Sequence, residues 1–211
     1  MLTESIIRDA RPALASIARE PFLSALAEDR LSAAALGRWV QEDTHFLRAL
    51  RRSTALLAAN APSERAVDVI TSAYPALQSE LDRFAQEARW LGIDLDAEPQ
   101  PVTSRFSELL FESTSAGFAD GIAVYWAVEL AYLDAWSTVR ESVGLTGTHA
   151  GWIENWTSDG FREFVRELGV LVDEHADPAT ARARALEVLE LERELWRWCF
   201  TPDEDPRPDA T

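Results

Sequence analysis

The sequence predicts an all-α protein, a single-domain bundle of seven to eight helices. Two observations support this prediction. Apolar residues recur at three- and four-residue spacing along almost the whole chain, which is the period of an amphipathic helix. No segment shows the alternation of apolar and polar residues that is typical of a half-buried strand, and we find no internal repeat and no glycine-rich phosphate loop.

The 211 residues suit one well-filled domain, which we expect to span residues 1–200. The remaining segment, TPDEDPRPDAT at 201–211, has no apolar content to bury. We therefore expect a disordered, acidic, proline-rich tail.

The first half of the chain predicts two shorter helices near residues 3–19 and 21–30, followed by a long helix that Ser32 caps. A further helical pattern begins at Ser63 and runs to about Leu91, and Pro75 should break it near Tyr74. The long helix after Ser32 has one apolar face that includes a single acid: Leu36, Trp39, Val40, Asp43, Phe46, Leu47 and Leu50.

The second half begins with a predicted loop, GIDLDAEPQP, at Gly92–Pro101. Helical periodicity then predicts four long helices, at 102–115, 118–143, 159–175 and 178–200. The helix at 118–143 contains the most aromatic and apolar run of the chain, AVYWAVELAYLDAW, with Glu129 in its middle.

The composition argues against several classes of function. A formal net charge of −16 opposes binding to nucleic acid or to an anionic membrane, because each phosphate contact needs a Lys or Arg. All 20 basic residues are arginine, so no lysine can form a Schiff base with pyridoxal phosphate. We see no signal peptide, no apolar run long enough for a membrane span, and only one cysteine, Cys199. These features lead us to expect a cytoplasmic protein.

Three carboxylates are predicted to lie in the core. Residues at i±3 and i±4 share a helix face, so an acid with apolar residues at all four positions should point inward. Among the 36 acids of the chain, only Asp43, Glu129 and Glu192 meet this condition. Their apolar neighbours are Trp39, Val40, Phe46 and Leu47 for the first, Tyr125, Trp126, Tyr132 and Leu133 for the second, and Val188, Leu189, Leu195 and Trp196 for the third.

A buried carboxylate must be neutralised, hydrogen-bonded or paired. None of the three has an arginine on its own face, so we expect them around one polar pocket inside the bundle. Such a pocket suits a flat, nitrogen-rich, protonatable ligand, because carboxylates accept its N–H groups while rings such as Trp126 and Tyr132 stack on it. A structural alternative stays open, in which the acids bond to backbone or indole N–H groups and the aromatic residues only fill the core.

Four segments resemble, in order, the TenA family, which comprises thiaminase II and its relatives in the haem-oxygenase-like helical fold. EPFLSALAEDRLSAAALGRWVQEDTHFL (Glu20–Leu47) is similar to the family's Pro-Phe, short helix and aspartate followed by aromatic residues. AVYWAVELAYLDAW (Ala123–Trp136) is similar to the branch that carries glutamate instead of the cysteine nucleophile. NWTSDGFREFV (Asn155–Val165) and VLELERELW (Val188–Trp196) resemble the C-terminal pattern, which ends in a glutamate four residues before a tryptophan.

The resemblance implies a hydrolase of aminopyrimidine or formylaminopyrimidine derivatives, of the type that salvages degraded thiamin, without a metal or an organic cofactor. Asp43 would hold the exocyclic amine and a ring nitrogen. Glu192 would be the principal acid/base, and Glu129 would assist it in place of the thiol. The resemblance also implies a homodimer or homotetramer, and it implies that the ring is bound by Phe46, Phe106, Tyr125, Trp126, Tyr132 and Trp156.

Two other interpretations stay open. A non-catalytic homologue that binds a small molecule would need every feature of the pocket, and in this chain Phe46, Phe106 and Trp156 stand where the cysteine branch places tyrosine hydroxyls. A metal-dependent oxygenase of the same fold would use an E-x-x-H pair such as Glu42 and His45. Because Glu42 shares its face with Arg38, we expect Glu42 and His45 to be ordinary surface residues.

Overall fold

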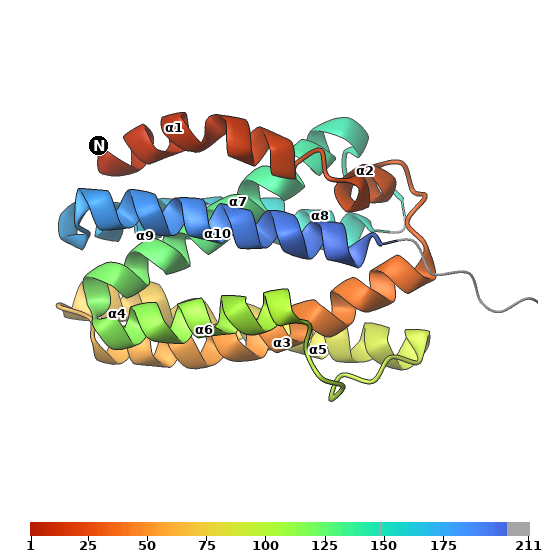
Figure 1. The fold of residues 1–211 in the computed structure, drawn as a ribbon, viewed down its shortest axis with the longest axis horizontal. Coiled ribbons are helices and arrows are strands. Elements are labelled where there is room, and N and C mark those ends of the chain that lie inside the picture. Colours follow the sequence, from red (N-terminus) through yellow and green to blue (C-terminus); the bar gives the residue numbers. More distant parts are fainter. Residues whose placement is uncertain (148, 202–211) are drawn as a thin grey trace, which may run out of the picture.

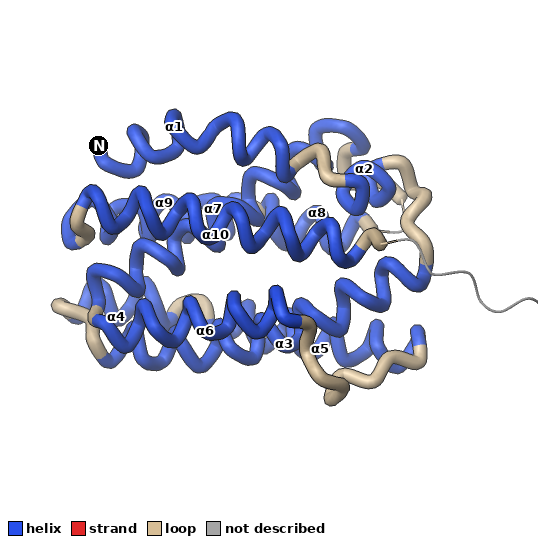
Figure 2. Tube along the Cα trace, viewed as in Figure 1, coloured by secondary structure: helices blue, strands red, loops and turns tan. Residues whose placement is uncertain are grey.

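The computed structural model describes residues 1–147 and 149–201, so the predicted tail at 201–211 lies, apart from Thr201, outside the described residues. The described residues form helices and no strand (Figure 2). The helices are α1 (Leu2–Ile17), α2 (Pro21–Ala27), α3 (Ala33–Ala59), α4 (Glu64–Thr71), α5 (Tyr74–Leu91), α6 (Pro101–Ala116), α7 (Phe118–Val143), α8 (Ala150–Thr157), α9 (Asp159–His175) and α10 (Pro178–Cys199).

The all-α prediction is confirmed, and the bundle consists of the seven helices that have 16 residues or more. The helices α2, α4 and α8 are short connecting elements. Helix α8 was not among the predicted helices. Its signal is present, because Trp152, Ile153 and Trp156 recur at helical spacing and all three are buried.

Local signals explain where the helices begin and end. The Ser32 hydroxyl oxygen accepts the Ala35 N–H at 3.1 Å, as expected for the cap of α3. Pro75 lies in the first turn of α5, which begins after the break predicted near Tyr74. Gly92 ends α5 in the left-handed conformation, with φ of 72°, which glycine adopts at low cost.

Helix α7 crosses the centre of the bundle and packs against α1, α2, α3, α6, α8, α9 and α10 (Figure 1). In Figure 1, α3, α4, α5 and α6 form one side of the molecule, whereas α1, α9 and α10 form the other. The apolar character of α7 on all sides follows from this position, because it has almost no solvated face. Glu129 therefore lies on the most enclosed helix of the fold.

None of the helices in residues 1–147 and 149–201 combines the length and the apolar character that a membrane span requires.

A cluster of aromatic rings fills the core beside the three predicted acids. The Trp39 ring lies within 5.0–6.3 Å, centroid to centroid, of Phe22, Phe84, Trp136, Trp152, Trp156 and Trp196. Aromatic pairs at such distances contribute about 0.5–1.5 kcal/mol beyond the area they bury. Asp43 lies one turn after Trp39, and Glu192 lies one turn before Trp196, so this cluster gives both acids a rigid support.

Candidate active site

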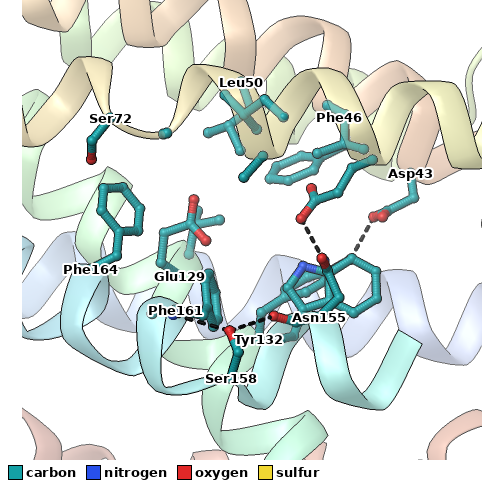
Figure 3. A pocket seen from close by; sticks show the side chains of 18 residues that line it. Asp43, Phe46, Leu50, Ser72, Glu129, Tyr132, Asn155, Ser158, Phe161 and Phe164 are labelled. Carbon is teal, nitrogen blue, oxygen red and sulfur yellow. Dashed lines mark hydrogen bonds between the residues drawn. The ribbon is translucent and has the colours of Figure 1, made fainter. Parts of the chain in front are cut away.

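A cavity of about 340 Å³ opens between α3, α5, α7, α8 and α9 (Figure 3). This volume lies in the range of small-molecule sites, roughly 300–1,000 Å³. Its polar lining consists of three carboxyl groups and a few neutral donors, and no basic side chain lines it. The lining residues are Asp43, Phe46, Leu47, Leu50, Ser72, Ala73, Ala76, Leu77, Glu80, Val128, Glu129, Tyr132, Asn155, Trp156, Ser158, Gly160, Phe161 and Phe164.

Asp43 is buried, as the sequence predicted, and it lines the cavity. The Tyr132 hydroxyl donates a hydrogen bond of 2.5 Å to Asp43 Oδ1, whereas Oδ2 has no partner. Burial raises the pKa of Asp43 to about 8, against the opposing effect of the Tyr132 hydrogen bond. Near neutral pH the Asp43 side chain is therefore mainly a neutral acid with one oxygen fixed and the other available.

Glu129 also lines the cavity, and only 8% of its surface is exposed. Figure 3 shows its carboxyl group directed into the space between Phe164 and Leu50. Burial raises the pKa of Glu129 to about 8, with further contributions from the charges of Glu80 and Asp43. Glu129 can therefore hold a proton at neutral pH and exchange it with a ligand.

Glu80 is a third cavity carboxyl group that the sequence analysis missed. Its oxygen Oε1 accepts a hydrogen bond of 2.7 Å from Asn155 Nδ2. Burial raises the pKa of Glu80 to about 7, while the Asn155 hydrogen bond and the Arg83 charge oppose this rise. A signal for its burial is present in the sequence, because Ala76, Leu77 and Phe84 share its helix face, but Arg83 at the fourth position breaks the apolar set.

Glu192 is buried but does not line the cavity. Neither of its carboxyl oxygens has a partner with the geometry of a hydrogen bond, although the Trp196 side chain lies near enough to lower the pKa slightly against the effect of burial. Burial raises the pKa of Glu192 well above its usual value, and the nearby charges of Asp43 and Glu129 raise it further. The predicted burial of Asp43, Glu129 and Glu192 is therefore confirmed, and two of them, Asp43 and Glu129, meet at one cavity.

The six predicted ring-binding residues divide into two groups. Phe46, Tyr132 and Trp156 line the cavity. Phe106, Tyr125 and Trp126 are buried outside the lining. The Phe106 ring packs against Phe46 at 4.8 Å, centroid to centroid, so it supports a wall of the cavity. Trp126 packs against Gly169 of α9, where an added Cβ would lie 3.2 Å from Trp126 Nε1.

The chain is similar in sequence and in fold to proteins of one known family. The sequence profile of the TENA/THI-4/PQQC family matches residues 7–200. The chain belongs to this family. A TenA homologue from Pyrococcus furiosus has 26% identity and a TM-score of 0.86, and the match covers 95% of this chain and all of that protein. The TENA/THI-4/PQQC assignment thus agrees in sequence and in fold.

More distant structures support the fold of the TENA/THI-4/PQQC family alone. The TenA homologue of P. horikoshii OT3 has 18% identity and a TM-score of 0.85, with 95% of this chain and 98% of that protein covered. A candidate TenA-like thiaminase of Sulfolobus solfataricus P2 has 11% identity and a TM-score of 0.79, with coverage of 93% and 94%.

A curated relative from Fusarium pseudograminearum (strain CS3096), named a probable transcription factor, is 25% identical over 162 residues. The match covers 57% of this chain, and the chain spans only about a third (32%) of the length of that relative.

One expectation about this TENA/THI-4/PQQC family member was wrong. Glu42 is fully buried, not solvated, and its Oε2 accepts hydrogen bonds from the Gln100 N–H at 2.9 Å and the Thr103 hydroxyl at 2.5 Å. Arg38, which suggested solvent, extends away and donates to the carbonyl oxygens of Cys199 and Thr201.

His45 is half-buried, and its Nε2 lies 2.9 Å from the Ala97 carbonyl oxygen, so both members of the E-x-x-H pair contact the segment that links α5 and α6. The described part of the chain contains no cluster of three or more His, Cys, Asp or Glu side chains that could hold a metal ion.

The arrangement can exchange protons with a ligand and bind its N–H groups. No ion pair within the described residues involves Asp43, Glu80, Glu129 or Glu192. Val128, not a cysteine, precedes Glu129 in the lining. Cys199 is buried at the end of α10, where burial raises the pKa of its thiol well above the usual value, so it is a poor nucleophile.

Proposed function

We propose that the chain is a TenA-type hydrolase that cleaves a C–N bond in an aminopyrimidine or formylaminopyrimidine derivative, with Glu129 in place of a thiol. One observation carries the proposal: Asp43, Glu80 and Glu129 face one aromatic-lined cavity without a basic partner. Buried acids that no protein cation neutralises are expected where a ligand supplies the missing donors and charge. The match to TenA homologues supports the same class of activity.

Asp43 orients the ring in this proposal. A neutral carboxylic acid carries one O–H donor and one acceptor oxygen, which complement a ring nitrogen and the adjacent exocyclic amine of an aminopyrimidine. Tyr132 fixes Asp43 Oδ1 and leaves Oδ2 free. The rings of Phe46 and Trp156 line the same cavity and supply apolar surface for the flat face of the ligand.

Glu129 transfers the proton. The oxygen of a water molecule bonds to the carbon while the C–N bond breaks and the amine departs. When the amine binds uncharged, neutral Glu129 supplies the proton with which it leaves, and the resulting carboxylate accepts the proton released by the water. When the amine binds as an ammonium group, it already carries that proton, and Glu129 acts as the carboxylate that accepts the water proton and passes it to the departed amine. A pKa of about 8 suits both halves of this cycle near neutral pH.

The resemblance makes Glu192 the principal acid/base, and its two unpartnered oxygens support that role. Because Glu192 lies outside the cavity lining, the ligand must either extend to it or exchange a proton with it through Asp43 and Glu129. The four acids then titrate as a coupled group. A homodimer or homotetramer and a cytoplasmic location stay predictions.

The decisive experiment incubates the purified protein with aminomethyl- and formylaminomethyl-pyrimidine analogues of the thiamin ring and follows release of ammonia or formate. Glu129→Gln and Glu192→Gln should each lower the rate by about 100-fold or more, since general acid/base groups contribute roughly that much. Glu190→Gln, an exposed residue of the same helix as Glu192, is the matched control and should leave the rate unchanged. Unchanged rates in both active-site variants would contradict the proposed roles.

A non-catalytic binding protein is the second candidate, and the absence of a thiol beside Glu129 favours it. Thermal stabilisation by the same two compounds without any release would support this candidate. A Silicibacter protein with 18% identity is described as a TenA family transcription regulator. A direct contact of the present chain with DNA is opposed by its net charge of −16.

A further inference from the structure

Glu80 is a cavity carboxyl group held by a side-chain hydrogen bond, and the resemblance assigned it no role. It is on α5, which packs against the helix that carries Asp43, and only 8% of its surface is exposed. Asn155 of α8 holds Oε1 at 2.7 Å, which fixes the side chain at the cavity wall. Helix α8 therefore contributes a positioning residue to the site.

Arg83, whose charge lowers the pKa of Glu80, does not line the cavity. Arg83 lies one turn further along α5, but its Nη1 donates to the Gly151 carbonyl oxygen at 2.8 Å. Its guanidinium carbon lies 4.8 Å from the centre of the Trp152 ring. Arg83 consequently lowers the pKa of Glu80 through its charge without forming an ion pair with it.

The three cavity acids differ in the ease with which they ionise. Asp43 and Glu129 have pKa values of about 8, while that of Glu80 is about 7. The cause lies in the surroundings, because Asn155 and Arg83 stabilise the charged form of Glu80. Glu80 is thus the cavity acid whose charged form is favoured both by a hydrogen bond and by a nearby positive charge.

We propose that Glu80, positioned by Asn155, is the specificity-determining residue that selects ligands with a cationic amino substituent over neutral ones. This inference rests on the proposed function and narrows it, because it favours the aminomethyl over the formylaminomethyl substrate. An ammonium group donates a charge-assisted hydrogen bond to Glu80 and neutralises a charge that no basic side chain of the lining can neutralise. A formylamino group supplies an N–H donor but no charge.

The test compares kcat/KM for the aminomethyl and the formylaminomethyl compound, which differ in charge at the same position. Glu80→Gln keeps a side-chain oxygen that can accept the hydrogen bond from Asn155 Nδ2, and it removes the negative charge of the carboxylate. We expect this variant to lower the ratio of kcat/KM for the amine to kcat/KM for the amide by about fivefold or more. The matched control is Glu87→Gln, which changes the same residue type on α5 outside the lining and should preserve the selectivity ratio.

A second variant separates a positioning role from a structural one. Asn155→Leu removes the donor and keeps a similar volume, so it should lower the ratio of kcat/KM for the amine to kcat/KM for the amide by about threefold or more. If the protein binds the compounds without turnover, the ratio of their dissociation constants from calorimetry replaces the ratio of kcat/KM.

The possible failures are distinguishable. Equal losses for both compounds in Glu80→Gln, or an unchanged ratio, would overturn the selectivity role while the proposed hydrolase stands. A wild-type protein that neither binds nor cleaves either compound would overturn the proposed function, and this inference with it.

Discussion

Glu42 and Asp43 are consecutive residues of α3, and both are buried, yet their surroundings differ completely. Glu42 faces the segment between α5 and α6, where the Gln100 N–H and the Thr103 hydroxyl occupy one of its oxygens. Asp43 faces the cavity, where Tyr132 occupies one oxygen and the other has no partner. A helix turns by about 100° per residue, which directs neighbouring side chains to different partners.

The difference shows that burial of a carboxyl group does not by itself mark a functional site. The interactions of Glu42 are complete, and with His45 and Arg48 it holds the connecting segment to α3. Asp43, which lines the cavity, and Glu192, which lies outside the lining, have buried oxygens without a hydrogen-bond partner. The useful criterion is therefore the hydrogen-bonding state of the buried acid.

The sharpest test of this comparison is Asp43→Asn. We expect kcat/KM to fall by about 100-fold or more, because the variant can no longer present an acid to the ring, while Tyr132 keeps an oxygen to bind. Below about pH 4, where Asp43 is protonated in the folded and the unfolded state, the free energy of unfolding should change by less than about 1 kcal/mol. Rates of ammonia release and urea denaturation measure the two effects. A large loss of stability with intact turnover would reverse the roles assigned to the two residues.

Glu42→Ala should produce the opposite result. The Gln100 N–H and the Thr103 hydroxyl would lose a buried acceptor, so the free energy of unfolding should fall by about 2–3 kcal/mol. The folded variant should keep kcat/KM within about threefold of the wild type. Urea denaturation at matched pH checks the first expectation, with Glu190→Gln as a surface control. A stability equal to that of the wild type would show that these hydrogen bonds contribute nothing.

The free energy of unfolding should depend on pH because Asp43 ionises less readily in the folded than in the unfolded protein. In the folded protein the pKa of Asp43 is about 8 against an ordinary value of 3.8, so the folded state binds the proton more tightly. The resulting stabilisation is complete below about pH 4 and is lost as pH rises towards 8, by up to about 1.4 kcal/mol per pH unit. Asp43→Asn should make the unfolding free energy less dependent on pH between 5 and 8. An identical slope in variant and wild type would contradict the raised pKa.

Arg48→Ala should have the smallest effect. Arg48 is exposed on α3, and its guanidinium group donates a hydrogen bond of 2.9 Å to the Leu95 carbonyl oxygen in the segment between α5 and α6. We expect a loss of about 0.5 kcal/mol, since exposed polar contacts contribute little. Limited proteolysis should nevertheless cut the segment 92–100 faster than in the wild type. Cutting at the wild-type rate would mean that Glu42 and His45 hold this segment without Arg48.

Helical periodicity in the sequence determined most of the architecture and three of the buried acids. The helices 118–143 and 159–175 were predicted at their observed bounds, and the break at Pro75 was predicted because proline cannot continue a helix. Asp43, Glu129 and Glu192 were found because four apolar neighbours on one face leave an acid no direction except the core. These results depend only on contacts within one helix.

Tertiary structure decided which acids share a cavity and which are already satisfied. Glu42 and Glu80 each have an arginine among their helical neighbours, and the sequence could not show that Arg38 and Arg83 extend away to distant carbonyl oxygens. Nor could it show that Asn155 would meet Glu80 across 75 residues of chain. Such pairings arise from the packing of helices that are remote in sequence, because long side chains choose partners only when those helices have come together.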